Sequence, residues 1–133
     1  MAVRVVCAGT FDHLHPGHIS FLNQAKALGS ELIVIVARDK TVRRIKGITP
    51  DHDEQRRKHD VERAGIADRV VLGNEDEDIF SILHILSPDI VALGYDQRIS
   101  EEKITKRFPG CGVIRLEPFH PEKFKSSLYR SER

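Results

Sequence analysis

The sequence has little of several residue types that mark particular protein classes. It contains no tryptophan, one methionine and only two cysteines among 133 residues. Two cysteines cannot build the disulfide framework of a small secreted domain, so we expect a reducing, cytoplasmic setting. No apolar run approaches the ~20 residues of a membrane span, and the first residues lack a signal-peptide layout. Composition thus argues against the membrane, secreted and fibrous classes.

An excess of charge of one sign is also missing. The chain carries 21 basic and 20 acidic residues, a formal net charge of +1. A polyelectrolyte partner is not implied, so we expect no nucleic-acid and no membrane partner, although a local basic patch is compatible with these numbers. The length suits one domain and is too short for separate cofactor and substrate domains. We therefore predict a single domain over residues 1–133.

Apolar runs and amphipathic stretches alternate along the chain. The expected strands are residues 3–8, 32–37, 69–72, 90–93 and 112–116. The run 32–37 (LIVIVA) is uninterrupted, which is typical of a strand covered on both faces. Strands that alternate with helices indicate βαβ units and a parallel sheet. The predicted fold is a single Rossmann-like, doubly wound α/β domain with a five-stranded parallel sheet.

Helix boundaries are also marked in the sequence. Pro16 opens a helix at a first-turn position and Gly29 ends it. Asp51 with Glu54 resembles a capping box and opens a helix that runs to about Ala64. Further helices are expected over residues 79–86, from Ser100, and from Ser126. Residues 38–50 are predicted to form a basic loop.

The segment GTFDHLHPGH, residues 9–18, follows the first predicted strand and opens the first helix. A helix N-terminus offers free N–H groups and a positive dipole end to a phosphate. Gly9 and Gly17 allow the backbone to approach a ligand closely. His15 and His18 are three residues apart, so both can donate to one phosphate. Helix capping alone would explain a single histidine at this position, but it does not explain two of them as well.

A zinc site is the alternative for this segment, because His13, His15 and His18 are close in sequence. No set of cysteines or carboxylates with ligand spacing accompanies them. We therefore expect no metal ligands here. The cysteines are also expected to be structural, Cys7 in the core and Cys111 as a loop thiol.

Three other segments offer groups for a nucleotide. Residues 38–58 hold eight basic against four acidic side chains, and a mobile basic loop could close over a triphosphate. A solvated surface explains most of these charges equally well. Asp96 could accept hydrogen bonds from ribose hydroxyls beside Gly94, where a simple turn is the alternative. Ser126 and Ser127 could hold phosphates or serve as ordinary N-caps.

The string GTFDHLHPGH resembles the GxFDxxHxGH signature of the nucleotidyltransferase superfamily that contains the cytidylyltransferases and phosphopantetheine adenylyltransferases. Members join a nucleoside triphosphate to a phosphate group and release pyrophosphate. The resemblance implies that His15, His18 and Lys46 are catalytic. It also implies nucleotide-binding roles for Gly9, Thr10, Phe11, His15, Pro16, Gly17, His18, Arg56, Gly94, Asp96, Ser126 and Ser127.

Within this superfamily the chain is most similar to the archaeal FAD synthases. The strings AGTFDHLHPGH, ELIVIVARDKTVRRIKG and PDIVALGYDQ carry this resemblance, whereas the final segment departs from it. His15 argues against the phosphopantetheine branch, which usually has threonine there. The resemblance implies ATP and FMN as substrates, a divalent metal such as Mg²⁺ bound with the triphosphate, and a homodimer. The alternatives are a glycerol-3-phosphate cytidylyltransferase, another small phosphate-acceptor enzyme, or a non-catalytic nucleotide sensor.

Overall fold

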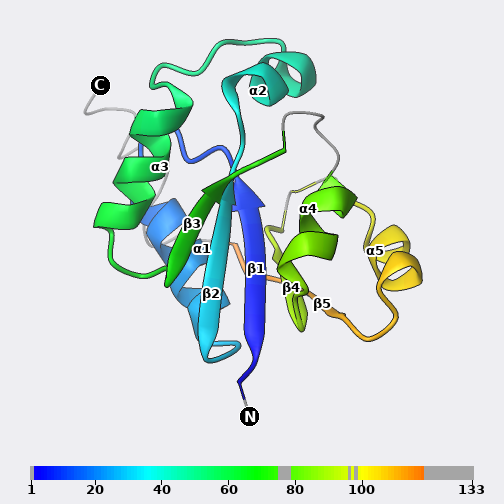
Figure 1. Ribbon diagram of the computed structural model, residues 1–133. Helices are drawn as coiled ribbons and strands as arrows, with labels where there is room; N and C mark the ends of the chain where they lie inside the picture. Colours follow the sequence, from blue (N-terminus) through cyan, green and yellow to red (C-terminus); the bar gives the residue numbers. More distant parts are fainter. Residues whose placement is uncertain (1, 75–78, 96, 98, 119–133) are drawn as a thin grey trace.

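The computed structural model describes residues 2–74, 79–95, 97 and 99–118. Its centre is one sheet of five parallel strands in the order β3-β2-β1-β4-β5 (Figure 1). The strands are β1 (Arg4–Gly9), β2 (Glu31–Val36), β3 (Arg69–Leu72), β4 (Ile90–Leu93) and β5 (Gly112–Arg115). The predicted Rossmann-like α/β architecture is confirmed.

Five helices flank this sheet in the described part of the chain. They are α1 (Pro16–Lys26), α2 (Asp39–Lys46), α3 (Glu54–Arg63), α4 (Ile79–Leu86) and α5 (Glu101–Arg107). Helices α1 and α3 cover one face, and α4 and α5 cover the other (Figure 1). Within the described ranges, every helix is too short or too polar to cross a membrane.

The sheet is apolar on both faces because both faces are covered. Val5 and Cys7 of β1 pack in the cluster with Leu22 of α1. Val6, between them on the strand, packs in the opposite cluster with Leu83 of α4. Alternating residues of one central strand thus contribute to two cores, as a strand of period two must do between two helical layers.

The prediction of a loop over residues 38–50 was wrong, because α2 lies inside it. The helix is short and strongly basic, and Val42 is its one buried residue among those described. Gly47 ends it in the left-handed conformation at φ 71°, a position that favours glycine. One buried apolar residue gives little apolar periodicity, and the N-cap residue Arg38 makes no side-chain cap hydrogen bond.

The predicted end of the first helix was also wrong. Helix α1 ends at Lys26 with Ala27 as its C-cap, and Gly29 lies beyond it. A Cβ on Gly29 would lie 2.5 Å from the Val3 carbonyl oxygen and 2.8 Å from Val5 Cγ2. Gly29 is thus required by close contact with the first strand rather than by the helix terminus.

The start of α3 differs from the prediction by two residues. Asp53 is the N-cap, and its side chain accepts from the Arg56 N–H at 2.8 Å. Asp51 instead contacts His13 through its carboxylate. Strand boundaries differ from the prediction by one residue in β1, β2 and β5. The helix predicted from Ser126 lies outside the described residues.

Candidate active site

The strand order reverses between β1 and β4, which creates the switch point where such sheets bind ligands. Gln97 links the two strand ends there. Its Oε1 accepts from the Gly94 N–H at 2.7 Å, and its Nε2 donates to the Ala8 carbonyl at 2.8 Å. The backbone after β4 is thereby fixed beside the end of β1. The predicted residues Gly9 and Gly94 are brought together at this point.

The two motif histidines cap the N-terminus of α1. His15 Nδ1 accepts from the Gly17 N–H at 3.1 Å, and His18 Nδ1 accepts from the His15 N–H at 3.3 Å. The rings stack with centroids 3.8 Å apart. Because both Nδ1 atoms accept, each neutral ring carries its proton on Nε2. The caps thus set the tautomer that makes Nε2 a hydrogen-bond donor.

The environment of His18 keeps its ring neutral at physiological pH. Burial, together with the nearby His15 and Lys46, lowers the pKa of His18 from 6.5 to about 4, while Asp12 acts in the opposite direction. The influence of Lys46 also shows that its ammonium lies within electrostatic reach of the histidine pair. The predicted catalytic residues His15 and His18 are therefore in contact, and Lys46 acts electrostatically on His18; their catalytic roles stay a prediction.

Phe11 is a buried residue whose ring packs against the ring of His18. Its ring is 3% exposed, its backbone has a φ of 56°, and its edge meets His18 with centroids 5.5 Å apart. A Cβ on Gly9 would lie 2.9 Å from the Phe11 ring. Gly9 therefore makes room for Phe11, and Phe11 positions the His18 ring.

Arg57 is a residue beside the site that the sequence did not single out among the eight basic residues of segment 38–58. Its side chain is fully buried and donates four hydrogen bonds. The acceptors are the carbonyls of His52 (2.9 Å), Thr10 (2.8 Å) and Ala37 (2.7 Å), and the carboxylate of Asp39 (2.7 Å). One guanidinium thus holds the loop after β1, the end of β2 and the start of α3. Its spacing of four residues from buried Val61 was the available indication.

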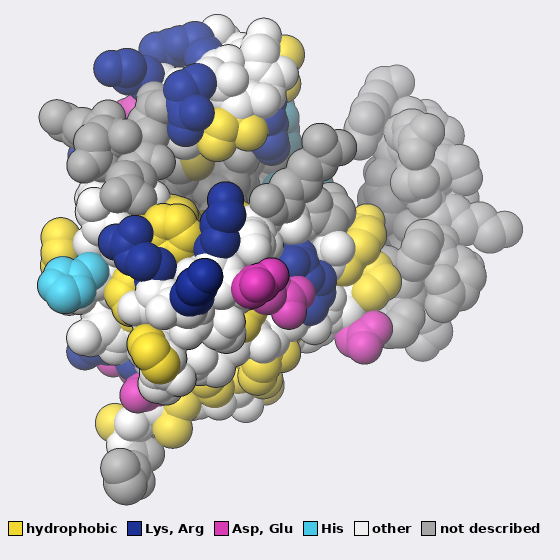
Figure 2. Space-filling view, turned by 90° about the vertical axis from the view of Figure 1, so that its right-hand side faces the viewer, with side chains coloured by type: hydrophobic (Ala, Val, Ile, Leu, Met, Phe, Trp, Pro, Cys, Tyr) yellow, Lys and Arg dark blue, Asp and Glu magenta, His cyan; other side chains and the backbone are white. Residues whose placement is uncertain are grey.

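The predicted triphosphate contacts lie on the surface around this buried arginine. Arg56 is 58% exposed and pairs with Asp60 one turn along α3. Lys46 ends α2 in an exposed run, residues 43–49. Figure 2 shows Lys and Arg side chains gathered at the top of the molecule, at the level of α2 in Figure 1. The carboxyl edge of the sheet therefore carries positive charge suited to an anionic ligand.

A second arginine holds the loop that follows β4. Arg115 donates to the carbonyls of Gly94 (2.7 Å) and Gln97 (2.8 Å), and its Nε lies 2.9 Å from a carboxylate oxygen of Glu101. Gly94 and Gln97 are thus held through their carbonyls by a side chain of β5. The predicted nucleotide-binding residues Asp96, Ser126 and Ser127 lie outside the described residues.

Asp12 connects the motif loop to the segment before α3. Its carboxylate accepts from the backbone N–H groups of Asp51 (2.7 Å) and His52 (3.1 Å). Burial acts to raise the pKa of Asp12, but these hydrogen bonds and the nearby His13 and His52 outweigh it and lower the pKa. Asp12 is therefore an ionised anchor beside the histidine pair.

Comparison with known proteins agrees with this geometry. Residues 6–131 match the family model described as cytidylyltransferase-like. The FAD synthase of Archaeoglobus profundus is 53% identical over 86% of this chain and 75% of that protein. The FAD synthase of Methanosarcina barkeri is 48% identical over 85% of this chain and 82% of that protein.

A solved structure shows the same fold. The lipopolysaccharide core biosynthesis protein of Thermoplasma volcanium has a TM-score of 0.84 and 35% identity, covering 90% of this chain and 99% of that one. The family match spans nearly the whole chain, and the motif histidines lie at the switch point of a Rossmann-like sheet. The chain belongs to the cytidylyltransferase-like family of nucleotidyltransferases.

Proposed function

We propose that the protein is an FAD synthase, which transfers AMP from ATP to FMN and releases pyrophosphate. The observation that carries the reaction class is the pair of histidines, His15 and His18, at the N-terminus of α1. The relatives that match over most of the chain support FMN as the acceptor. The proposed enzyme is therefore a nucleotidyltransferase that binds both substrates at one edge of the sheet.

The reaction is a displacement at phosphorus. An oxygen of the FMN phosphate bonds to the α-phosphorus of ATP, and the bond from that phosphorus to the α–β bridging oxygen breaks. Pyrophosphate leaves with the electron pair. The attacking oxygen is already anionic, so no protein nucleophile is needed. Catalysis then depends on alignment and on neutralising charge at the α-phosphate.

The described side chains suit these two tasks. The Nε2–H groups of His15 and His18 are donors for the α-phosphate oxygens, and they accompany the positive end of the α1 dipole. Lys46 and Arg56 supply positive charge for the departing pyrophosphate. Gly94 offers backbone for the nucleoside. Arg57 acts as a positioning residue because it is buried behind the loops that form the site.

The remaining assignments rest on the family resemblance. We place Asp96 on the ribose, Ser126 and Ser127 on phosphate, and the backbone of Thr10, Pro16 and Gly17 along the triphosphate. We also propose a homodimer in the cytoplasm, a compartment that suits the two buried free thiols, Cys7 and Cys111.

Enzymes of this family generally use a divalent metal with the nucleotide. Mg²⁺ prefers an octahedron of oxygen ligands and retains several waters. The one group of three His, Cys, Asp or Glu side chains found among the described residues offers a single carboxylate and two imidazoles. That set does not fit Mg²⁺, so we assign Mg²⁺ to the triphosphate oxygens and water, and no step depends on a protein ligand.

The reaction is tested by offering ATP or CTP with FMN, glycerol 3-phosphate or phosphopantetheine, and by measuring pyrophosphate release and the product. FAD should form from ATP and FMN. Pyrophosphate release with CTP alone among the nucleotides would overturn the adenylyl assignment. No turnover with any pair would support a nucleotide sensor instead.

The histidine assignment is tested by His18→Ala. Loss of one transition-state donor should lower kcat by about two orders of magnitude or more. His59→Ala is the matched control, since His59 is an exposed histidine on α3. Near-normal turnover of a folded His18→Ala protein would contradict the mechanism.

A further inference from the structure

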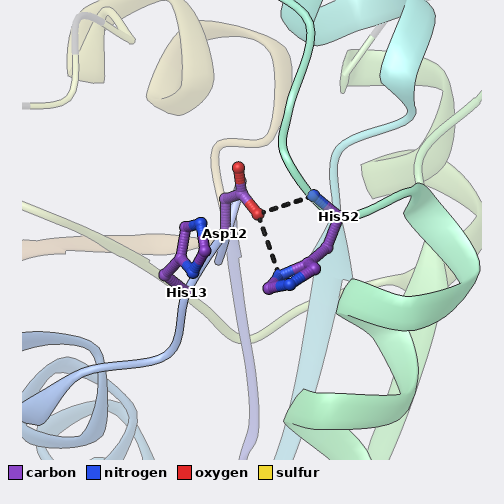
Figure 3. A group of neighbouring side chains, drawn as sticks. All are labelled: Asp12, His13 and His52. Carbon is purple, nitrogen blue, oxygen red and sulfur yellow. Dashed lines mark hydrogen bonds and ion pairs between the residues drawn. The ribbon is translucent and has the colours of Figure 1, made fainter.

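Three side chains next to the histidine pair form a cluster that the proposed reaction does not use. Asp12 and His13 lie in the loop after β1, and His52 lies in the segment before α3 (Figure 3). One ligand atom from each residue lies within 4.8 Å of the others. The sequence had grouped His13 with His15 and His18, but those two turn toward their own helix.

His52 carries the clearest sign that this cluster is incomplete. Its Nδ1 is buried and has no hydrogen-bond partner among the described residues. It nevertheless lies 3.3 Å from Asp12 Oδ1. A buried ring nitrogen that faces a carboxylate without a directed hydrogen bond is unfavourable, because its polar atom has lost water without replacement. A cation between the two atoms would satisfy both.

The geometry suits a metal ion. In a tetrahedral site with ligands at about 2.0–2.1 Å, neighbouring ligand atoms lie about 3.3–3.4 Å apart. The His52 Nδ1 to Asp12 Oδ1 distance of 3.3 Å has this value. Asp12 is held in place by two backbone N–H groups, and the exposed His13 ring lies with its centroid 4.5 Å from that of His52. The Asp51 carboxylate lies 2.7 Å from His13 Nε2, so another carboxylate stands beside the cluster.

The donor set selects the kind of metal. Two imidazoles and one carboxylate favour borderline first-row dications such as Zn²⁺ and Co²⁺ over Mg²⁺. Three protein ligands leave room for a water or a substrate oxygen. The site is also near the phosphate donors, since the charge of Asp12 acts on His18.

We propose that Asp12, His13 and His52 form a binding site for one first-row transition-metal dication, separate from the Mg²⁺ carried by the nucleotide. The ion would join the motif loop to the segment that begins α3. Because the three ligands are protein groups, binding needs no nucleotide. This metal site rests on different residues from the FAD synthase assignment, so the two can be tested separately.

The test uses metal-free full-length protein without nucleotide. Co²⁺ is titrated and followed by its visible d–d absorption, and Zn²⁺ binding is measured by calorimetry. We expect one equivalent of each to bind, and a large excess of Mg²⁺ to leave the Co²⁺ spectrum unchanged. Absence of saturable binding, or displacement of Co²⁺ by Mg²⁺ at equal concentration, would overturn the proposal.

Substitutions locate the site. His52→Gln and His13→Gln should each weaken Co²⁺ binding by at least about ten-fold. His13 is exposed, so its substitution tests the site even where a change at His52 lowers stability. His59→Gln is the control and should bind Co²⁺ like the unmodified protein. Equal affinity in the His13 and control variants would contradict the assigned ligands.

Discussion

The neighbouring arginines Arg56 and Arg57 allow a sharp test of how the site is built. Arg57 is fully buried and bonded to three carbonyls and the Asp39 carboxylate, whereas Arg56 is 58% exposed and pairs with Asp60. We therefore expect Arg57→Met to destabilise the protein strongly and Arg56→Met to leave its stability nearly unchanged. The two variants differ by one position and make the same chemical change.

The magnitude follows from the contacts. Removing one partner of a buried ion pair costs about 3–5 kcal/mol, and here three carbonyls and the Asp39 carboxylate, whose side chain is 24% exposed, would lose their buried donor. A domain of this kind has about 5–15 kcal/mol of stability in total. At this chain length each kcal/mol corresponds to about 3–4 °C, so Tm should fall by about 9–20 °C. The exposed i,i+4 pair of Arg56 is worth only about 0.3–0.5 kcal/mol.

The assay is thermal and urea unfolding followed by circular dichroism, with FAD formation measured on the same samples. Arg56→Met should raise KM for ATP with Tm unchanged, if it contacts the triphosphate as proposed. Arg57→Lys keeps the charge but loses the fork geometry, so it should fall between Arg57→Met and the unmodified protein. It also provides a folded variant where methionine prevents folding. An Arg57→Met protein within about 1 kcal/mol of the unmodified protein would refute the positioning role.

Two further predictions concern pH and the loop after β4. The lowered pKa of His18 should make unfolding free energy largest above about pH 6.5 and decrease it as pH falls toward about 4, because the unfolded chain then binds a proton that the folded site does not. His18→Gln should remove that part of the pH profile, and an identical profile would contradict the assignment. Arg115→Met should raise KM for ATP by about ten-fold with little change in kcat, since it loosens the loop at Gly94. Lys103→Met, an exposed change on the neighbouring helix α5, is the control, and an unaltered KM for Arg115→Met would count against this role.

The sheet and the motif could be predicted because their signals are local. Residues 32–37 form a continuous apolar run, and only a strand covered on both faces accommodates it in so few residues. The start of the helix at Pro16 can likewise be predicted, because proline is favoured in the first turn of a helix. The histidine pair needs only this local frame, since both rings bond to the backbone of their own helix. Short stretches of the sequence are thus enough to predict the fold class and the pair of histidines at the start of α1.

The supporting residues could not be predicted because their partners are distant in sequence. Arg57 reaches Thr10 across 47 residues, and Gln97 reaches Ala8 across 89. Nothing near Arg57 distinguishes it from Arg56 except the face of α3 on which it lies. Likewise, α2 escaped detection because Val42 is its one buried residue among those described and its N-cap residue makes no side-chain cap hydrogen bond. Tertiary contacts, which composition does not reveal, therefore determine the roles of Arg57 and Gln97 and the presence of α2.

The capping arrangement at α1 explains why two histidines, rather than serine or aspartate, stand at this helix N-terminus. A capping side chain must accept from a backbone N–H, which imidazole does only through an unprotonated nitrogen. Burial and the nearby positive groups keep His18 in that neutral form. The same bond then directs the proton to Nε2, where it can be donated to an anion. Serine could cap but would lack this outward N–H, and aspartate would repel the phosphate. The same two side chains therefore cap the helix and serve as the proposed phosphate donors. Because the His18 ring is neutral, positive charge for the phosphate must come from residues such as Lys46 and from the helix N-terminus.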